Sequence, residues 1–109
     1  MFYAKEDIIK LSNQIDDIIL EFITLKLNKV NMEDDKYIIS LKKTTKSIQR
    51  IINKFEDIYE CSKNGESDLI YYLDEIFCDY NYLVGIFNGD VTITHSDEEF
   101  WRKKHIKKL

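Results

Sequence analysis

An apolar spacing of three and four residues, running almost without a break through the first half of the chain, constrains its fold more than any other feature. Over residues 4–30 this spacing selects Ile8, Leu11, Ile15, Ile18, Phe22 and Leu25. Because a period of 3.6 residues places such positions on one face, the segment predicts a long amphipathic helix. Ile19, Ile23 and Leu27 widen the stripe, so we expect the helix to pack against more than one neighbour. Asn31 is a candidate left-handed cap at its end.

The same spacing predicts a second long helix over residues 34–62. Its apolar line consists of Tyr37, Leu41, Thr44, Ile48, Ile51, Phe55 and Ile58. Asn64 and Gly65 follow as a typical helix stop. Two long helices joined by only a few residues must fold back on each other, so the sequence predicts an antiparallel αα-hairpin.

A third, shorter helix is expected over residues 67–80, and a change of pattern follows it. The segment LVGIF, then Asn88 and Gly89, then DVTIT alternates in a way that is typical of two short strands. Asn-Gly between such segments favours a type I′ turn. We therefore expect a two-stranded β-hairpin over residues 83–94, with one of its faces packed on the helices.

The last segment predicts a short helix over residues 97–108. Ser96 followed three residues later by Glu99 matches a capping box that would begin it. The elements together predict a single domain over residues 1–109 with a mainly α fold of the α+β class: a long αα-hairpin, a third helix, a β-hairpin and a short final helix.

Charge is sorted along the chain. Residues 55–101 carry twelve acidic side chains and one basic one, Lys63, whereas the tail from Arg102 to Lys108 carries five basic side chains and no acid. Like charges that lie close together repel, so the acidic stretch is expected to face positive charge. That charge is either the basic tail folded back on it or the surface of a basic partner.

Two tyrosines lie among these acids on the predicted third helix. Exposed tyrosines surrounded by charge are typical of the centres of protein interfaces, so Tyr71 and Tyr82 are candidate anchors. The alternative is that both are partly buried beneath the adjacent ribbon, and that the acids form a solvated face. The candidate partner-binding residues are Asp68, Tyr71, Asp74, Glu75, Asp79, Tyr82, Asp97, Glu98 and Glu99.

These features lead us to expect a small acidic protein-binding inhibitor that occludes a basic partner. An immunity protein, an antitoxin or a phage anti-defence protein has this character, and a nuclease or nucleic-acid-binding complex is the natural basic target. The alternative is a nucleic-acid-binding or regulatory protein that uses the tail and the line formed by Lys42, Lys46, Arg50 and Lys54. That line is also compatible with a solvated helix face, and the wide apolar stripes are compatible with a homodimer.

Catalysis finds little support in the motifs. His95 and His105 are the two histidines, and neither stands in a metal-binding or catalytic spacing. We therefore expect no enzyme, no cofactor and no metal site. Cys61 and Cys78 lie seventeen residues apart without a CxxC pair, which favours reduced, half-buried thiols.

The chain contains no apolar run long enough for a membrane span, so a cytoplasmic protein without membrane attachment is expected. It has no proline and is rich in isoleucine, lysine and asparagine, whose codons are AT-rich. This composition indicates a low-GC bacterium, or a phage or virus, as its source.

Overall fold

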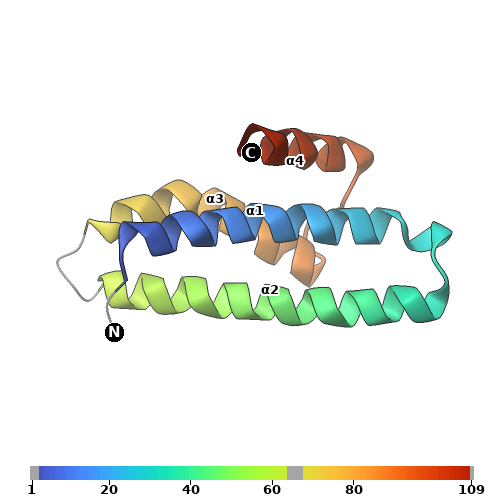
Figure 1. Cartoon of the computed structure of the whole chain (residues 1–109), viewed down its shortest axis with the longest axis horizontal. Helices are drawn as coiled ribbons and strands as arrows, with labels where there is room; N and C mark the ends of the chain where they lie inside the picture. Colours follow the sequence, from blue (N-terminus) through green and yellow to red (C-terminus); the bar gives the residue numbers. More distant parts are fainter. Residues whose placement is uncertain (1–2, 64–67, 109) are drawn as a thin grey trace.

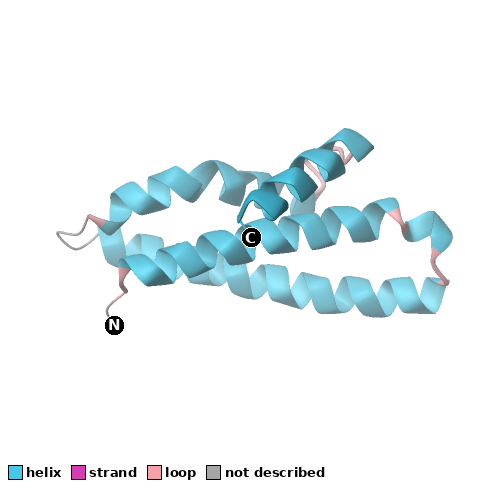
Figure 2. Cartoon of the chain, turned by 45° about the horizontal axis from the view of Figure 1, so that its top comes forward, coloured by secondary structure: helices cyan, strands magenta, loops and turns pink. Residues whose placement is uncertain are grey.

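The structure, a computed structural model, describes residues 3–63 and 68–108 as a helical assembly. Its elements are α1 Lys5–Leu27, the short 3₁₀ helix η1 Lys29–Asn31, α2 Asp34–Lys63, α3 Leu69–Asn88 and α4 His95–Lys108. The molecule is elongated, with extents of 49 × 26 × 25 Å. α1 and α2 lie antiparallel along the long axis, α3 follows one half of this pair, and α4 lies over α1 (Figure 1, Figure 2). The predicted stop at Asn64 and Gly65 and the predicted start at residue 67 lie outside the described residues.

α1 is the central helix, because it packs against α2, α3 and α4. Leu11, Ile15, Ile19 and Ile23 have no exposed area at all. This confirms the expectation that its wide apolar stripe faces more than one neighbour. A helix covered on three sides must be apolar around most of its circumference, which a strict two-position stripe does not provide.

α1 and α2 form the predicted αα-hairpin, but the link between them differs from the prediction. α1 ends at Leu27 and is followed by η1, in which the Asn31 N–H donates to the Asn28 carbonyl at 3.0 Å. The prediction of Asn31 as a left-handed cap is wrong, since no described residue other than glycine has a positive φ. The chain instead passes into a 3₁₀ turn whose bonds satisfy the Asn28 and Lys29 carbonyls, while the Asn28 N–H donates to the Thr24 carbonyl of α1 at 3.0 Å.

The predicted β-hairpin over residues 83–94 is wrong, since the described residues contain no strand. α3 continues as a helix to Asn88, eight residues beyond its predicted end at residue 80. Leu73, Tyr80, Leu83 and Ile86 are all buried, at spacings of seven, three and three residues. The apolar run LVGIF therefore extends the buried stripe of α3. Its contacts with the αα-hairpin formed by α1 and α2 override its β-like composition.

Asn88 and Gly89 end α3 instead of forming a type I′ turn. Gly89 has φ 80° and ψ 12°, the left-handed conformation that glycine adopts without a Cβ clash. The Asp90 N–H donates to the Gly85 carbonyl at 2.9 Å and the Gly89 N–H to the Ile86 carbonyl at 3.3 Å. These two bonds define a Schellman motif. Asn-Gly is suited to both structures, because each needs a positive φ.

Gly85 explains how the chain turns back after this cap. A Cβ built on Gly85 would lie 2.8 Å from Val91 Cγ2, closer than real Cβ contacts allow. The missing side chain lets Val91 pack directly on the helix backbone. Glycine inside α3 thus permits the close return of the loop that leads to α4.

α4 begins at His95, two residues earlier than predicted, and Thr94 caps it. The Asp97 N–H donates to Thr94 Oγ1 at 3.3 Å, and the Thr94 N–H donates to Asp97 Oδ2 at 2.9 Å. The capping box therefore joins Thr94 and Asp97, and the predicted pair Ser96 and Glu99 is wrong. Both pairs fit the same motif, and only the loop geometry distinguishes them.

Trp101 anchors α4 to the rest of the molecule. Its side chain is 5% exposed, and its ring stacks on Tyr82 of α3 with centroids 5.1 Å apart. His105 Nδ1 lies 2.8 Å from Asp17 Oδ1 on α1. The tail is thus docked on the molecule. None of the helices in the described part of the chain has the length and apolar character needed to cross a membrane.

Candidate binding surfaces

The outer side of α3 carries the part of the predicted site that is open to solvent. Asp68, Tyr71, Asp74 and Glu75 are all exposed, and Tyr71 is 69% exposed. They project away from the buried stripe of α3 because their positions lie on the opposite side of the helix. None of these three carboxylates forms an ion pair with another described residue. We call these four residues the acidic face.

Asp79 and Tyr82 belong to the contact between α3 and α4 and not to the acidic face. Lys104 Nζ lies 2.7 Å from Asp79 Oδ2, and its ammonium also lies 4.7 Å from the centre of the Trp101 ring. Tyr82 is half-buried against Trp101. Burial and the nearby Asp97 carboxylate raise the pKa of Tyr82 above its usual value. Two of the predicted interface residues therefore hold the molecule together.

The three predicted acids of α4 also have partners within their own helix or at its N-cap. Asp97 closes the capping box with Thr94. Glu98 Oε2 lies 3.6 Å from Arg102 Nη2, and Glu99 Oε1 lies 3.2 Å from Lys103 Nζ, each pair four residues apart. The Glu99 pair is about 70% exposed on both sides, where such pairs contribute little to stability. The basic tail thus pairs with acids of its own helix and, through Lys104, with Asp79 of α3.

An aromatic cleft between α2 and α3 was not predicted as a site. Phe55 and Tyr59 lie on α2 and Tyr80 lies on α3, so their meeting is a tertiary contact. The cleft encloses about 170 Å³ and is lined by Phe55, Glu56, Tyr59, Glu60, Phe77 and Tyr80. A sequence signal did exist, since α2 repeats an aromatic residue followed by glutamate at Phe55-Glu56 and Tyr59-Glu60.

Tyr80 links the two helices at this cleft. Its ring stacks on Phe55 with centroids 3.8 Å apart, and its hydroxyl donates to Glu56 Oε1 at 3.3 Å. Burial, together with the negative charge of Glu56 and this hydrogen bond, raises the pKa of Tyr80 to about 12. The tyrosine therefore remains a neutral hydrogen-bond donor at any physiological pH.

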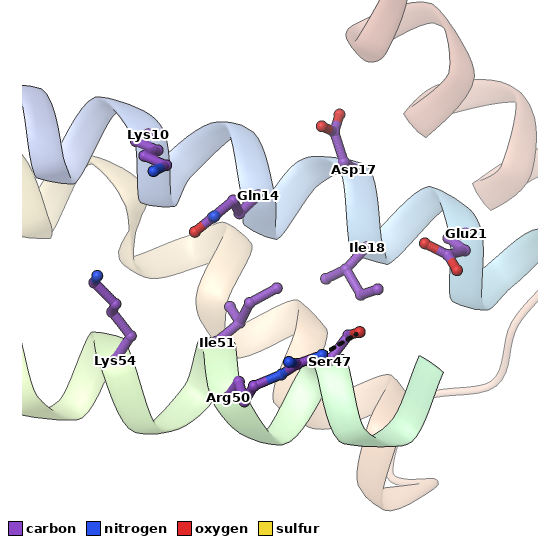
Figure 3. A pocket seen from close by; sticks show the side chains of 9 residues that line it. All are labelled: Lys10, Gln14, Asp17, Ile18, Glu21, Ser47, Arg50, Ile51 and Lys54. Carbon is purple, nitrogen blue, oxygen red and sulfur yellow. Dashed lines mark hydrogen bonds between the residues drawn. The ribbon is translucent and has the colours of Figure 1, made fainter. Parts of the chain in front are cut away.

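A second hollow lies between α1 and α2, on the side of this pair away from α3 (Figure 3). It measures about 430 Å³, with Lys10 and Lys54 toward one end, Asp17 and Glu21 toward the other, and Arg50 between them on α2. Figure 3 shows Lys54 reaching from α2 toward α1. We call this hollow the basic groove, because its three cations form no ion pair among the described residues.

Arg50 and Lys54 of the predicted basic line on α2 border the basic groove, whereas Lys46 lines a separate hollow with Arg50. Lys42, Lys46, Arg50 and Lys54 are all exposed, and the structure adds Lys10 of α1 to them. Arg50 Nη2 donates to Ser47 Oγ at 3.2 Å, which holds the guanidinium along the helix. The tail, which was expected to add to this line, is instead docked over α1, with Lys104 directed to α3.

The remaining candidate chemistry is sparse in the described part of the chain. Cys61 and Cys78 are free thiols and both are exposed, so the prediction of half-buried thiols is wrong. Among the residues that the structure describes, no three His, Cys, Asp or Glu side chains are grouped in a way that could hold a metal ion.

Comparison of the chain with protein-family models, with curated proteins and with solved structures finds no significant match. Its function must therefore be inferred from the surfaces themselves.

Proposed function

We propose that this protein is a small protein-binding inhibitor that occludes a basic partner through the acidic face of α3. The observation that carries the proposal is Tyr71, an aromatic side chain that is 69% exposed among carboxylates without ion-pair partners in the described residues. An exposed tyrosine loses little conformational entropy on binding and supplies apolar area and a hydroxyl together.

We narrow the proposed site from nine residues to the four of the acidic face. Asp79, Tyr82, Asp97, Glu98 and Glu99 already make contacts within the molecule. Docking of the basic tail shortens the acidic surface but leaves Asp68, Asp74 and Glu75 without an ion-pair partner among the described residues, although Lys5 lies over the Tyr72 ring on the same half of α3. The partner is expected to fill that gap with lysines or arginines.

The proposed mechanism is electrostatic steering followed by occlusion. Carboxylates on the acidic face attract a basic surface and occupy positions where phosphates would otherwise bind. Tyr71 then anchors the contact. A nuclease or another nucleic-acid-binding protein has such a surface, which fits the role of an immunity protein, an antitoxin or a phage anti-defence protein. Association should be fast at low salt and slow markedly as salt is added.

Affinity capture from the native host with a charge-reversed variant tests this proposal. D74K/E75K should lose a basic protein that the wild-type chain retains. The matched control is E33K/D90K, which changes the net charge equally at exposed positions away from the acidic face. Capture of the same partner by D74K/E75K at the wild-type level would exclude this surface.

The unpaired cations of the basic groove favour a second candidate, nucleic-acid binding along the basic line. Lys10 joins Arg50 and Lys54 at the basic groove, and Lys46 lines a second hollow that shares Arg50 with it, so cations from two helices could follow a phosphate backbone. A gel shift at two salt concentrations tests it. Binding that weakens steeply with salt and that K46E/R50E abolishes would support this function in place of the first.

A further inference from the structure

The aromatic cleft between α2 and α3 combines ring faces with negative charge. α2 supplies Phe55 and Tyr59, and α3 supplies Phe77 and Tyr80. Phe55 and Tyr80 are buried and form the inner wall, whereas Phe77 is 41% exposed at the rim. The Phe77 ring lies 6.3 Å from both Phe55 and Tyr80, tilted by 41° and 36°. Rings at different angles thus border one open cavity.

Two carboxylates stand at the edge of this cavity. Glu56 and Glu60 are exposed and lie four residues apart on α2, so their side chains are neighbours. Tyr80 donates to Glu56, but neither glutamate forms an ion pair with any lysine, arginine or histidine that the structure describes. The faces of aromatic rings also attract cations. Both components of the lining therefore favour a positively charged occupant.

We propose that the aromatic cleft binds the guanidinium group of an arginine side chain from the basic partner. A guanidinium is planar, stacks on ring faces and presents N–H donors to more than one carboxylate oxygen. The cavity of about 170 Å³ suits one such group, since a cavity of about 150 Å³ holds benzene. A lysine ammonium is compact and strongly hydrated, which makes it the weaker occupant.

This inference rests on the proposed function, because the arginine belongs to the basic partner. The cleft and the acidic face adjoin on α3, where Asp74 and Phe77 are three residues apart and hence neighbours on the helix surface. A partner held by the acidic face therefore lies beside the cleft. Steering by the acidic face and insertion of one arginine would fix the orientation of the partner.

A peptide titration tests the cleft without knowledge of the partner. The probes are blocked Gly-Arg-Gly and its lysine and citrulline counterparts, since citrulline keeps the shape of arginine and removes the charge. Ring resonances of Phe55, Tyr59, Phe77 and Tyr80 are followed by NMR. The arginine peptide should shift them, the lysine peptide should bind at least about threefold more weakly, and the citrulline peptide should leave them unchanged.

Variants locate the binding to the cleft. E56Q/E60Q should weaken the arginine peptide about tenfold, equivalent to about 1.4 kcal/mol, and F77L should weaken it less. The matched control E33Q/D90N removes the same charge at exposed positions away from both the cleft and the acidic face and should stay within about twofold of wild type. Circular dichroism and the unfolding midpoint check that each variant is folded. Equal shifts with citrulline, or an affinity that E56Q/E60Q does not change, would overturn the assignment.

Failure of this inference can be distinguished from failure of the proposed function. If capture depends on Asp74 and Glu75 while the arginine peptide leaves the rings unchanged, the cleft assignment is wrong and the inhibitor function stands. If the peptide binds at the cleft but no basic protein is captured through the acidic face, the function is wrong and the cleft stands.

Discussion

The two flanks of α2 are built from opposite chemistry. Toward α1 it lines the basic groove with Arg50 and Lys54, and toward α3 it lines the aromatic cleft with Phe55 and Tyr59 beside Glu56 and Glu60. The difference follows the position of α3, which covers one side of the α1–α2 pair and passes behind the groove in Figure 3. The aromatic rings of α2 lie on the flank where α3 packs, and its polar side chains lie on the flank where no third helix packs. Packing and charge therefore divide this helix lengthwise.

The largest expected effect tests whether the cleft flank carries more of the packing. F55A should lower the free energy of unfolding by about 3–5 kcal/mol, because Phe55 is 3% exposed and contacts three other rings. I51A on the groove flank removes a half-buried side chain and should cost about 1–2 kcal/mol. Urea unfolding of both variants measures the difference. Equal costs would mean that the flanks do not differ in packing.

The next effect compares a paired cation with an unpaired one. K104M removes the ammonium that lies 2.7 Å from Asp79, whose side chain is 20% exposed, and should cost about 1–2 kcal/mol. K54M, on the groove flank, should change stability by less than about 0.5 kcal/mol. K103M is the control within α4, because its pair with Glu99 is exposed. A K104M variant as stable as K103M would show that the tail is not held by Asp79.

Alkaline pH should weaken the cleft flank in particular. The pKa of Tyr80 is raised to about 12, so the unfolded chain loses this proton near pH 10 while the folded chain keeps it. The contribution is intact below pH 10 and is lost between about pH 10 and 12. Tyr3, whose hydroxyl donates to Asp57, also has its pKa raised to about 12 and titrates in the same range.

Unfolding midpoints at pH 9 and pH 11 measure this dependence in wild type, Y80F and Y3F/Y80F. The fall in stability should be smaller in Y80F and smaller again in the double variant. A fall of the same size in all three would show that other groups cause it.

The smallest effect concerns repulsion along α2. Glu56 and Glu60 are like charges four residues apart, and so are Arg50 and Lys54. E60Q and K54Q should therefore each raise stability by about 0.2–0.5 kcal/mol at low salt. Both gains should shrink in 0.5 M salt as the charges are screened. Destabilisation by E60Q at low salt would indicate that Glu60 has a favourable partner. Repulsion between like charges would then not be a property that the cleft flank shares with the groove flank.

The long helices could be predicted from the sequence because each buries a regular stripe over many turns. The end of α3 could not, since LVGIF with Asn-Gly fits a strand and turn as well as a helix and its Schellman cap. The helix is selected over the strand because Leu83 and Ile86 pack against the αα-hairpin formed by α1 and α2, and because Val91 packs over Gly85. Those contacts join parts of the chain that local patterns treat separately.

The candidate site was predicted in part, for a similar reason. Tyr71 and its neighbouring acids lie on the outer side of α3, and their exposure follows from helix geometry alone. Tyr82 is covered because Trp101 anchors α4 above it, and the weak apolar stripe of α4 left open whether the basic tail folds back on the acidic stretch. The aromatic cleft escaped prediction because its rings come from two helices, about twenty residues apart in sequence.

The central position of α1 has a consequence for how the chain is made. The faces of α1 that receive α3 and α4 are completed by residues such as Leu73, Leu83 and Trp101, all of which follow α2. Ribosomes add about 5–20 residues per second, so the isoleucines of α1 wait roughly 4–15 s for the last of these. During that interval the apolar face of the nascent αα-hairpin is exposed to solvent and to chaperones. Burial of the Trp101 indole ring then completes the core around α1.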